Sequence, residues 1–139
     1  FGIYEGSPPE INLKNERNNG EIVSKLINEK LVLSAHDISS GGLLVALSEM
    51  SIGSNFGVKI DKPKKLRNIF EYFFGEDQGR YLLEIDKKNL DKVKKILKNS
   101  NIYYESIGST QKNHFEIVDE IKCNIKDLYE INNQWYNNY

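Results

Sequence analysis

The sequence predicts a protein of the α/β (α+β) class, in which helices pack on a mixed sheet of about four to five strands. The first reason is that short apolar runs, typical of strands, alternate along the chain with amphipathic helical patterns. The second is the length of 139 residues, which is enough for one hydrophobic core. The third is a composition of 39% hydrophobic and 28% charged residues, which is ordinary for a globular protein. The nearest simple template is the ferredoxin-like half-motif.

The beginning of the chain is expected to be an extended arm or linker, over residues 1–19. This segment contains two glycines, two adjacent prolines and several asparagines, a composition that resists both helices and sheet ladders. The remaining residues, 20–139, are expected to form one domain. The chain begins with Phe1 rather than methionine, which is consistent with a piece of a longer polypeptide.

The first half of this domain is expected to contain a helix, a strand, a second helix and a second strand, over residues 21–29, 31–35, 43–53 and 56–60. The strand over 31–35 is a short apolar run of the kind that a sheet buries on both faces. Gly53 is expected to end the second helix. Strand, helix and strand of these lengths make a crossover unit, so the two strands are expected to be parallel.

The second half is expected to contain helix, strand, helix, strand, strand and helix, over residues 66–73, 82–85, 90–97, 102–107, 115–118 and 124–139. Gly75 is expected to stop the first of these helices. The strands over 102–107 and 115–118 are expected to form a hairpin, joined by a loop that begins at Gly108. His114, at the start of the second strand, is interpreted as a surface or edge residue.

The richest motif is the strand–turn–helix over residues 34–50, in which a polar turn with Asp37 leads into a helix. Small residues at a helix N-terminus suit a phosphate, because backbone N–H groups and the helix dipole favour an anion and glycine lets it approach. The backbone donors would come from Ser39, Ser40, Gly41 and Gly42. The alternative is an ordinary strand-to-helix turn in which Ser or Asp caps the helix.

A second polar motif follows over residues 73–85, where a glycine-flanked loop leads into a strand. The loop carries Glu76, Asp77, Gln78 and Arg80. Carboxylates beside a carboxamide and a guanidinium can hold Mg²⁺ and its phosphates. The alternative is a solvated turn with a surface ion pair, and composition alone does not separate the two.

Composition excludes several classes of function. The formal net charge of −1 gives no electrostatic reason to expect nucleic acid or an anionic membrane as a partner. No apolar run approaches the roughly 20 residues that span a bilayer, and the N-terminus lacks the pattern of a signal peptide, so a cytoplasmic location is expected. The single cysteine, Cys123, excludes an intrachain disulfide and is interpreted as a small hydrophobic residue.

Taken together, the two motifs resemble a known family. Residues 34–43 (SAHDISSGGL) and 74–81 (FGEDQGRY) are similar to the C-terminal domain of the large (synthetase) subunit of phosphoribosylformylglycinamidine synthase. The run from Gly6 to Pro9, with Ile11 and Leu13, also resembles the segment that leads into that domain. The resemblance covers nearly the whole chain and implies a fold of the aminoimidazole ribonucleotide synthase C-terminal-domain type.

The resemblance implies a role in purine biosynthesis. Members of the family use ATP, Mg²⁺ and ammonia to convert formylglycinamide ribonucleotide to its amidine. It further implies as partners an upstream ATP-binding domain of the same polypeptide, a glutaminase subunit or domain that supplies ammonia, and a small accessory subunit. The family's catalytic histidine lies in an N-terminal region outside this sequence, so no catalytic residue is assigned here and the chain alone is expected to be inactive.

Site residues carry over by internal pseudo-symmetry, because each half of the family's large subunit contains one such domain. The resemblance implies Asp37 and Glu76 as metal ligands. It implies phosphate or nucleotide contacts from Ser39, Ser40, Gly41, Gly42, Gln78 and Arg80. His36 and the small residues after Asp37 resemble the second half, where the site can hold substrate, a structural nucleotide or nothing. Two alternatives stay open: a docking domain without ligand contact, and the matching domain of aminoimidazole ribonucleotide synthase or selenophosphate synthase.

Overall fold

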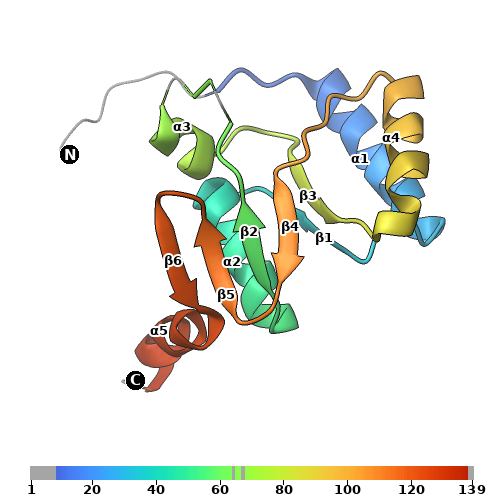
Figure 1. Cartoon of the computed structure of the whole chain (residues 1–139). Coiled ribbons are helices and arrows are strands. Elements are labelled where there is room, and N and C mark those ends of the chain that lie inside the picture. Colours follow the sequence, from blue (N-terminus) through green and yellow to red (C-terminus); the bar gives the residue numbers. More distant parts are fainter. Residues whose placement is uncertain (1–8, 64, 67, 138–139) are drawn as a thin grey trace.

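The computed structural model describes residues 9–63, 65–66 and 68–137. Helices and strands alternate along most of the chain (Figure 1). In chain order they are α1 (Leu13–Asn28), β1 (Ser34–Asp37), α2 (Gly42–Ser54), β2 (Gly57–Ile60), α3 (Ile69–Phe74), β3 (Tyr81–Glu84), a 3₁₀ turn (Lys87–Asn89), α4 (Leu90–Asn99), β4 (Gly108–Gln111), β5 (His114–Ile117), β6 (Ile121–Asn124) and α5 (Ile125–Asn137). None of the helices in these ranges is long and apolar enough to cross a membrane.

The strands form two sheets. Four of them make a mixed sheet in the order β4-β2-β5-β6, in which β2 runs parallel to β5 and antiparallel to β4, while β6 is antiparallel to β5. The other two, β1 and β3, pair antiparallel with each other as a separate ribbon. The expectation of a mixed sheet with helices packed on it is therefore confirmed.

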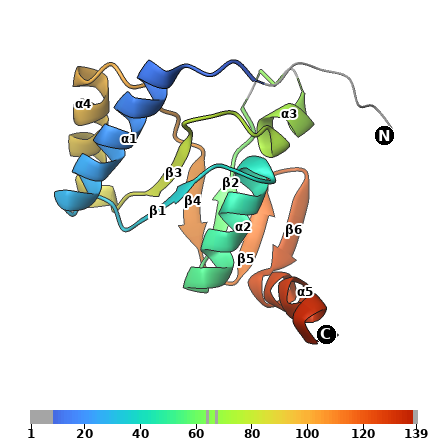
Figure 2. The same ribbon diagram turned by 180° about the vertical axis from the view of Figure 1, so that it is seen from behind.

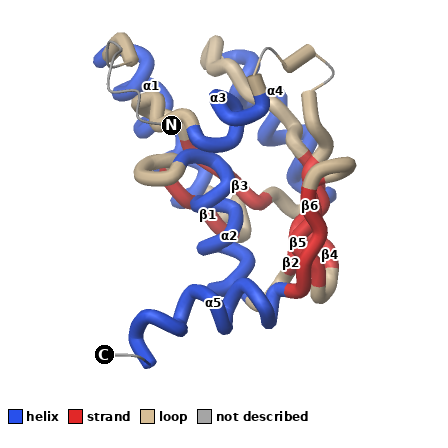
Figure 3. Tube along the Cα trace, turned by 90° about the vertical axis from the view of Figure 1, so that its left-hand side faces the viewer, coloured by secondary structure: helices blue, strands red, loops and turns tan. Residues whose placement is uncertain are grey.

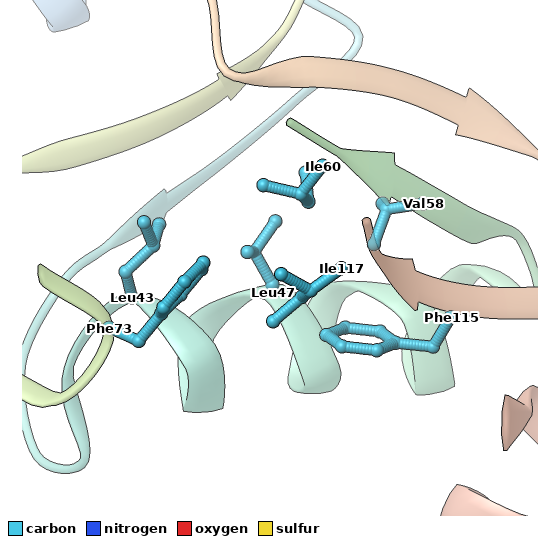
Figure 4. Close-up of a cluster of buried hydrophobic side chains, with 7 residues drawn as sticks. All are labelled: Leu43, Leu47, Val58, Ile60, Phe73, Phe115 and Ile117. Carbon is cyan, nitrogen blue, oxygen red and sulfur yellow. The ribbon is translucent and has the colours of Figure 1, made fainter. Parts of the chain in front are cut away.

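Helix α2 packs along one side of the four-stranded sheet, as Figures 2 and 3 show from two directions. Because side chains alternate along a strand, Val58 and Ile60 of β2 point to the same side as Phe115 and Ile117 of β5. These side chains meet α2 and α3 in the first core cluster, drawn in Figure 4 as Leu43, Leu47, Val58, Ile60, Phe73, Phe115 and Ile117. Cys123 packs half-buried against this cluster, and burial raises the pKa of its thiol.

The opposite side of the sheet is polar. Lys59 of β2, Glu116 of β5 and Lys122 of β6 stand in one row across three strands, because the strand registers pair Glu116 with both lysines. The Glu116 carboxylate oxygens lie 3.5 Å from Nζ of Lys59 and 3.3 Å from Nζ of Lys122. A hydrogen bond and the charge of Lys122, with a further contribution from Lys59, lower the pKa of Glu116.

The lowered pKa of Glu116 predicts a pH dependence of stability. A group with a depressed pKa in the folded state stabilises fully above its unfolded pKa, about 4.3 for glutamate, and loses that contribution as pH falls through the folded value. We therefore expect the free energy of unfolding of Glu116→Gln to fall less between pH 6 and pH 3 than that of the wild type, as measured by urea titration. Glu10→Gln, at an exposed glutamate, is the control and should follow the wild type. Equal slopes for both variants would contradict the prediction.

A second core cluster lies between α1 and α4. Its buried members are Ile22, Leu26, Leu31, Val93 and Leu97. The ribbon of β1 and β3 connects the two clusters, because neighbouring residues of β3 point to opposite sides: Leu82 packs against the first cluster and Leu83 against the second. The position of the ribbon therefore depends on both clusters.

The expectation of an extended arm over residues 1–19 is wrong from residue 13 onward, where α1 begins, and the helix crosses the expected boundary at residue 20 without a break. Asn12 caps the helix, since its side chain accepts a hydrogen bond of 3.0 Å from the backbone N–H of Asn15. Burial of Ile22 and Leu26 outweighs the low helix propensity of the preceding asparagines and glycine. The first eight residues of the expected arm lie outside the described residues.

The expected crossover unit is also wrong. The strand expected over 31–35 begins instead at Ser34, pairs with β3 and exposes Ala35 and Asp37, so it is not buried on both faces. Leu31 is buried, but it packs against α1 and α4 before the strand starts. An apolar run predicts burial without identifying the element against which it packs, which is why the pairing partner was missed.

The expected hairpin is wrong as well, because β2 lies between β4 and β5. Residues 102–107 form no strand, β4 lies in the expected loop, and β6 was not foreseen. Two glycines permit this insertion: a Cβ on Gly57 would lie 1.7 Å from the carbonyl oxygen of His114, and one on Gly108 would lie 2.1 Å from that of Lys59. Such close backbone approaches between distant segments leave no periodic signal in the sequence.

The remaining helices agree with the sequence in type and differ at their ends. Helix α2 continues through Gly53 and ends at Asn55, whose left-handed backbone (φ +56°) makes the C-cap. Helix α3 begins at Ile69, three residues later than expected, and ends at Gly75 as expected. Helices α4 and α5 lie where the apolar periodicity placed them.

Candidate functional site

The first motif forms a turn in which two successive glycines adopt left-handed backbone angles. Gly41 has φ +80° and Gly42 has φ +69°, values that side-chain-bearing residues rarely adopt. The backbone N–H of Gly42 donates to the carbonyl of Ser39 at 3.0 Å, which closes the turn at the start of α2. Both glycines are therefore required by the conformation of the turn.

Gly42 is also a point of close packing between α2 and α3. A Cβ at Gly42 would lie 2.7 Å from the carbonyl carbon of Phe74 and 2.8 Å from the carbonyl oxygen of Phe73. The end of α3 therefore rests directly on the turn. Because the second motif starts where α3 ends, this contact brings the two motifs together.

Glu76 of the second motif binds the first. Its Oε1 accepts a hydrogen bond of 2.7 Å from the backbone N–H of Gly41, across 35 positions of sequence. Helix α2 has no side-chain cap of its own and no acidic residue in its first turn, so Glu76 supplies the carboxylate that a helix N-terminus favours. A predicted metal ligand and a predicted phosphate donor thus contact each other.

Arg80 braces its own loop. Its Nη2 donates to the carbonyl of Gly75, and its Nε lies 3.4 Å from Oδ2 of Asp77, an ion-pair distance. The Nε atom is nevertheless buried and lacks a hydrogen bond among the described residues, because the Asp77 oxygen is not aligned with its N–H. Arg80 therefore connects parts of its own loop in this structure.

The other predicted ligands are less engaged. The side chain of Asp37 is 66% exposed, and Nδ1 of His36 lies 3.8 Å from its Oδ1. Ser39, Ser40 and Gln78 are exposed. Within the described ranges, no group of three or more His, Cys, Asp or Glu side chains could hold a metal ion. Asp37, at the end of β1, and Glu76, in the loop after α3, therefore do not belong to a closed set of ligands among the described residues.

His36 connects the turn to the body of α2, a role that the sequence motif did not indicate. Its Nε2 lies 3.2 Å from Oε2 of Glu49, and its Nδ1 lies 2.6 Å from the carbonyl oxygen of Asp37. Glu49 lies on the helix that follows the turn. The ring therefore bridges the strand end and the exposed side of the helix.

Helix α1 contacts the loop of the second motif, and the sequence did not predict these contacts. The Nδ2 of Asn19 donates to the carbonyl of Gly79 at 2.9 Å, and the backbone of Gly79 (φ +68°) lies against Glu16. No local pattern could have revealed these contacts, because α1 and the loop are 60 positions apart and the segment was expected to be an arm.

Tyr72 of α3 lies near Arg80 and the segment after α4. Burial, followed by the negative charge of Glu105, raises the pKa of Tyr72 to about 12, while the charge of Arg80 acts in the opposite direction. Tyr72 is therefore protonated at neutral pH and is not available as a general base. Its ring also packs edge-on against Phe73, with centroids 5.0 Å apart.

A surface hollow of about 660 Å³ lies elsewhere, along α1. The residues that line it run from Arg17 to Glu29, and none of them is a predicted site residue. The predicted site residues of the two motifs therefore lie outside this hollow, where the two motifs contact each other.

The chain is similar in sequence to a known protein family and to several of its members. The family model described as "AIR synthase related protein, C-terminal domain" matches residues 2–120. The chain is 46% identical over 134 residues to the phosphoribosylformylglycinamidine synthase subunit PurL of Pelagibacter ubique (strain HTCC1062), which covers 96% of this chain and 18% of that protein. It is 36% identical over 138 residues to the subunit of the same name from Rhodopseudomonas palustris (strain HaA2), which covers 99% of this chain and 19% of that protein. The chain thus spans only 18–19% of the length of these curated relatives.

Solved structures of Thermotoga maritima PurL have the same fold. PurL complexed with FGAR gives a TM-score of 0.69 at 18% identity, covering 82% of this chain and 21% of that chain. PurL complexed with ATP gives a TM-score of 0.69 at 17% identity, covering 81% of this chain and 21% of that chain. The resemblance read from the two motifs is confirmed, and so is the expected type of fold.

Proposed function

The chain belongs to the family of AIR synthase related protein C-terminal domains, and on this basis we propose that it is the C-terminal domain of a phosphoribosylformylglycinamidine synthase. The observation that carries the proposal is the 46% identity to a PurL subunit over 96% of the chain. The complete protein would convert formylglycinamide ribonucleotide to its amidine with ATP and ammonia, as a ligase of purine biosynthesis in the cytoplasm.

The two joined loops suit a role in holding phosphate groups. The small residues 39–42 offer backbone donors at the start of α2, where the helix dipole favours negative charge. Gln78 and Arg80 would add a carboxamide and a positive charge. Asp37 and Glu76 are oxygen donors of the kind that Mg²⁺ prefers, and the metal would neutralise phosphate charge.

The proposed site is shared with another part of the polypeptide. The exposure of Asp37 and of the turn supports this, because a phosphate site that binds tightly is normally enclosed. The upstream ATP-binding domain would close the site, and this chain alone would be inactive. A glutaminase subunit or domain and a small accessory subunit would complete the assembly; the solved neighbour named PurLQS from Thermotoga maritima supports partner subunits.

A second candidate function is docking without ligand contact. It is favoured by the intramolecular roles of the motif residues: Glu76 already engages the Gly41 amide, and Arg80 braces its own loop. Under this alternative the two motifs are folding elements, and the domain contributes a surface to its neighbour rather than a contact to the nucleotide.

Substitution of Asp37 in the complete polypeptide separates the two candidates. If Asp37 is a metal ligand, Asp37→Asn should weaken Mg²⁺–ATP binding about tenfold in isothermal titration, because one charged ligand is lost. Its thermal midpoint should match that of Asp61→Asn, the exposed control. If the domain only docks, stability or assembly would change while turnover per folded molecule stays at the wild-type value.

A titration of residues 1–139 alone with Mg²⁺ and ATP tests the shared site. We expect little binding by this chain and clear binding by the complete polypeptide. Tight binding by the chain alone would contradict a site that needs a second domain.

A further inference from the structure

Helix α1 lies against the second motif at three positions in its N-terminal half, Glu16, Asn19 and Gly20. The carboxamide of Asn19 donates to the carbonyl of Gly79 at 2.9 Å, in a half-buried position. A Cβ on Gly79 would lie 3.1 Å from Cα of Glu16, so helix and loop backbones touch there. One residue further along the helix, a Cβ on Gly20 would lie 3.4 Å from the hydroxyl of Tyr81.

Helix α1 is itself firmly anchored. Ile22 and Leu26 lie one and two turns beyond the contacts with the loop, and both are buried in the cluster that α1 shares with α4. Leu26 has no exposed surface. The side chain of Asn19 therefore projects from a fixed element, and its hydrogen bond transmits the position of that element to Gly79.

The loop over residues 75–80 is thereby held from two sides. On one side Asn19 binds Gly79, and on the other Glu76 binds the Gly41 amide of the first motif. Between them, Arg80 ties the loop to itself through the carbonyl of Gly75. Loss of the hydrogen bond between Asn19 and Gly79 would therefore shift Arg80, the next residue along the chain. Through the loop it would also shift Glu76.

We propose that Asn19 is a positioning residue of the nucleotide site: its carboxamide sets the second motif against the first by holding the Gly79 carbonyl. The inference rests on the proposed function for its effect on catalysis, whereas the structural coupling stands independently. Among the described residues, the side chain of Asn19 is hydrogen-bonded to Gly79 and to no predicted ligand side chain.

The sharpest substitution is Asn19→Asp. It keeps the shape of the side chain but replaces the donating amide with an oxygen that repels the Gly79 carbonyl. The matched control is Asn18→Asp, which introduces the same charge at the neighbouring, exposed position of the same helix. Effects of charge on the helix are therefore common to both variants, and the hydrogen bond to Gly79 distinguishes them.

The test uses the complete polypeptide and two readouts. Hydrogen–deuterium exchange of the peptides that cover residues 38–42 and 75–81 should accelerate about tenfold in Asn19→Asp and stay unchanged in Asn18→Asp, since a tether at a half-buried site is lost. In steady-state kinetics Asn19→Asp should raise KM for ATP about tenfold with kcat unchanged. A merely structural role would instead lower kcat with the folded fraction and leave KM alone.

The outcomes separate the inference from the function on which it rests. Equal exchange in both variants would overturn the positioning role, whatever the kinetics. Faster exchange at 38–42 and 75–81 in Asn19→Asp with wild-type KM would support the coupling between the loops and overturn its role in nucleotide binding. A wild-type polypeptide without ATP-dependent amidine formation would overturn the proposed function, and the exchange comparison would still decide the coupling.

Discussion

Gly42→Ala is expected to lower the free energy of unfolding by about 3 kcal/mol, the combined effect of a strained backbone and a steric clash. At φ +69° a residue with a Cβ pays roughly 1 to 2 kcal/mol. The new methyl group would also meet backbone atoms of Phe73 and Phe74 at 2.7–2.8 Å, where no flexible side chain can move aside. The turn and the end of α3 must separate, so the contact between the two motifs should loosen as well. Urea unfolding followed by circular dichroism measures the loss.

Gly53→Ala is the matched control for this prediction. Gly53 lies on the same helix, has nothing within 4 Å of its Cβ position and adopts a helical backbone. Alanine there should raise stability by about 0.5 to 1 kcal/mol, because it is the better helix former. A Gly42→Ala protein as stable as the wild type would show that neither the backbone angle nor the contact with α3 constrains this turn.

Phe115→Ala is expected to cost about 3 to 5 kcal/mol, because it removes a fully buried aromatic ring from the first core cluster. Phe115 is 1% exposed and lies in β5, where its ring faces α2 beneath the sheet (Figure 4). The loss should appear in chemical unfolding as a lower midpoint with an unchanged slope. Phe115→Leu, which leaves a smaller cavity, should cost about 1 to 2 kcal/mol and gives a measurement if the alanine variant does not fold.

Phe56→Ala removes the same side chain at an exposed position just before β2. Phe56 is 53% exposed, so its loss should change stability by less than about 1 kcal/mol. Similar costs for the two alanine variants would mean that burial in the sheet does not determine the contribution of Phe115.

The turn glycines of the candidate site could be predicted from the sequence because their signal is local. Gly41 and Gly42 stand next to each other between β1 and α2, and each adopts the left-handed angle that glycine alone takes easily. Glu76 and Arg80 were recognised as a polar loop between two apolar elements. The sequence does not show that the two motifs contact each other, because the hydrogen bond of Glu76 to the Gly41 amide joins residues 35 positions apart.

The sequence predicts most of the helices and strands of this fold, but it does not predict how the strands pair. Helices α4 and α5 follow apolar periodicities that a single helix face explains, whereas α2 is apolar around most of its surface. The position of β2 between β4 and β5 depends instead on the absence of a Cβ at Gly108, where β4 meets β2, and at Gly57, where β2 meets β5. The lack of a Cβ matters only when another strand approaches. Helix α1 shows the same limit, because a polar stretch with low helix propensity became helical once Ile22 and Leu26 were buried.

By itself, therefore, the sequence determined the class of fold, the type of most elements and the two motifs, because each depends on residues within a few positions of one another. Only the tertiary structure decided how the strands divide into a sheet and a ribbon, and that Asn19 of α1 reaches Gly79. Contacts of this kind are made between segments that are distant in the chain, where burial and close backbone approach outweigh local preference.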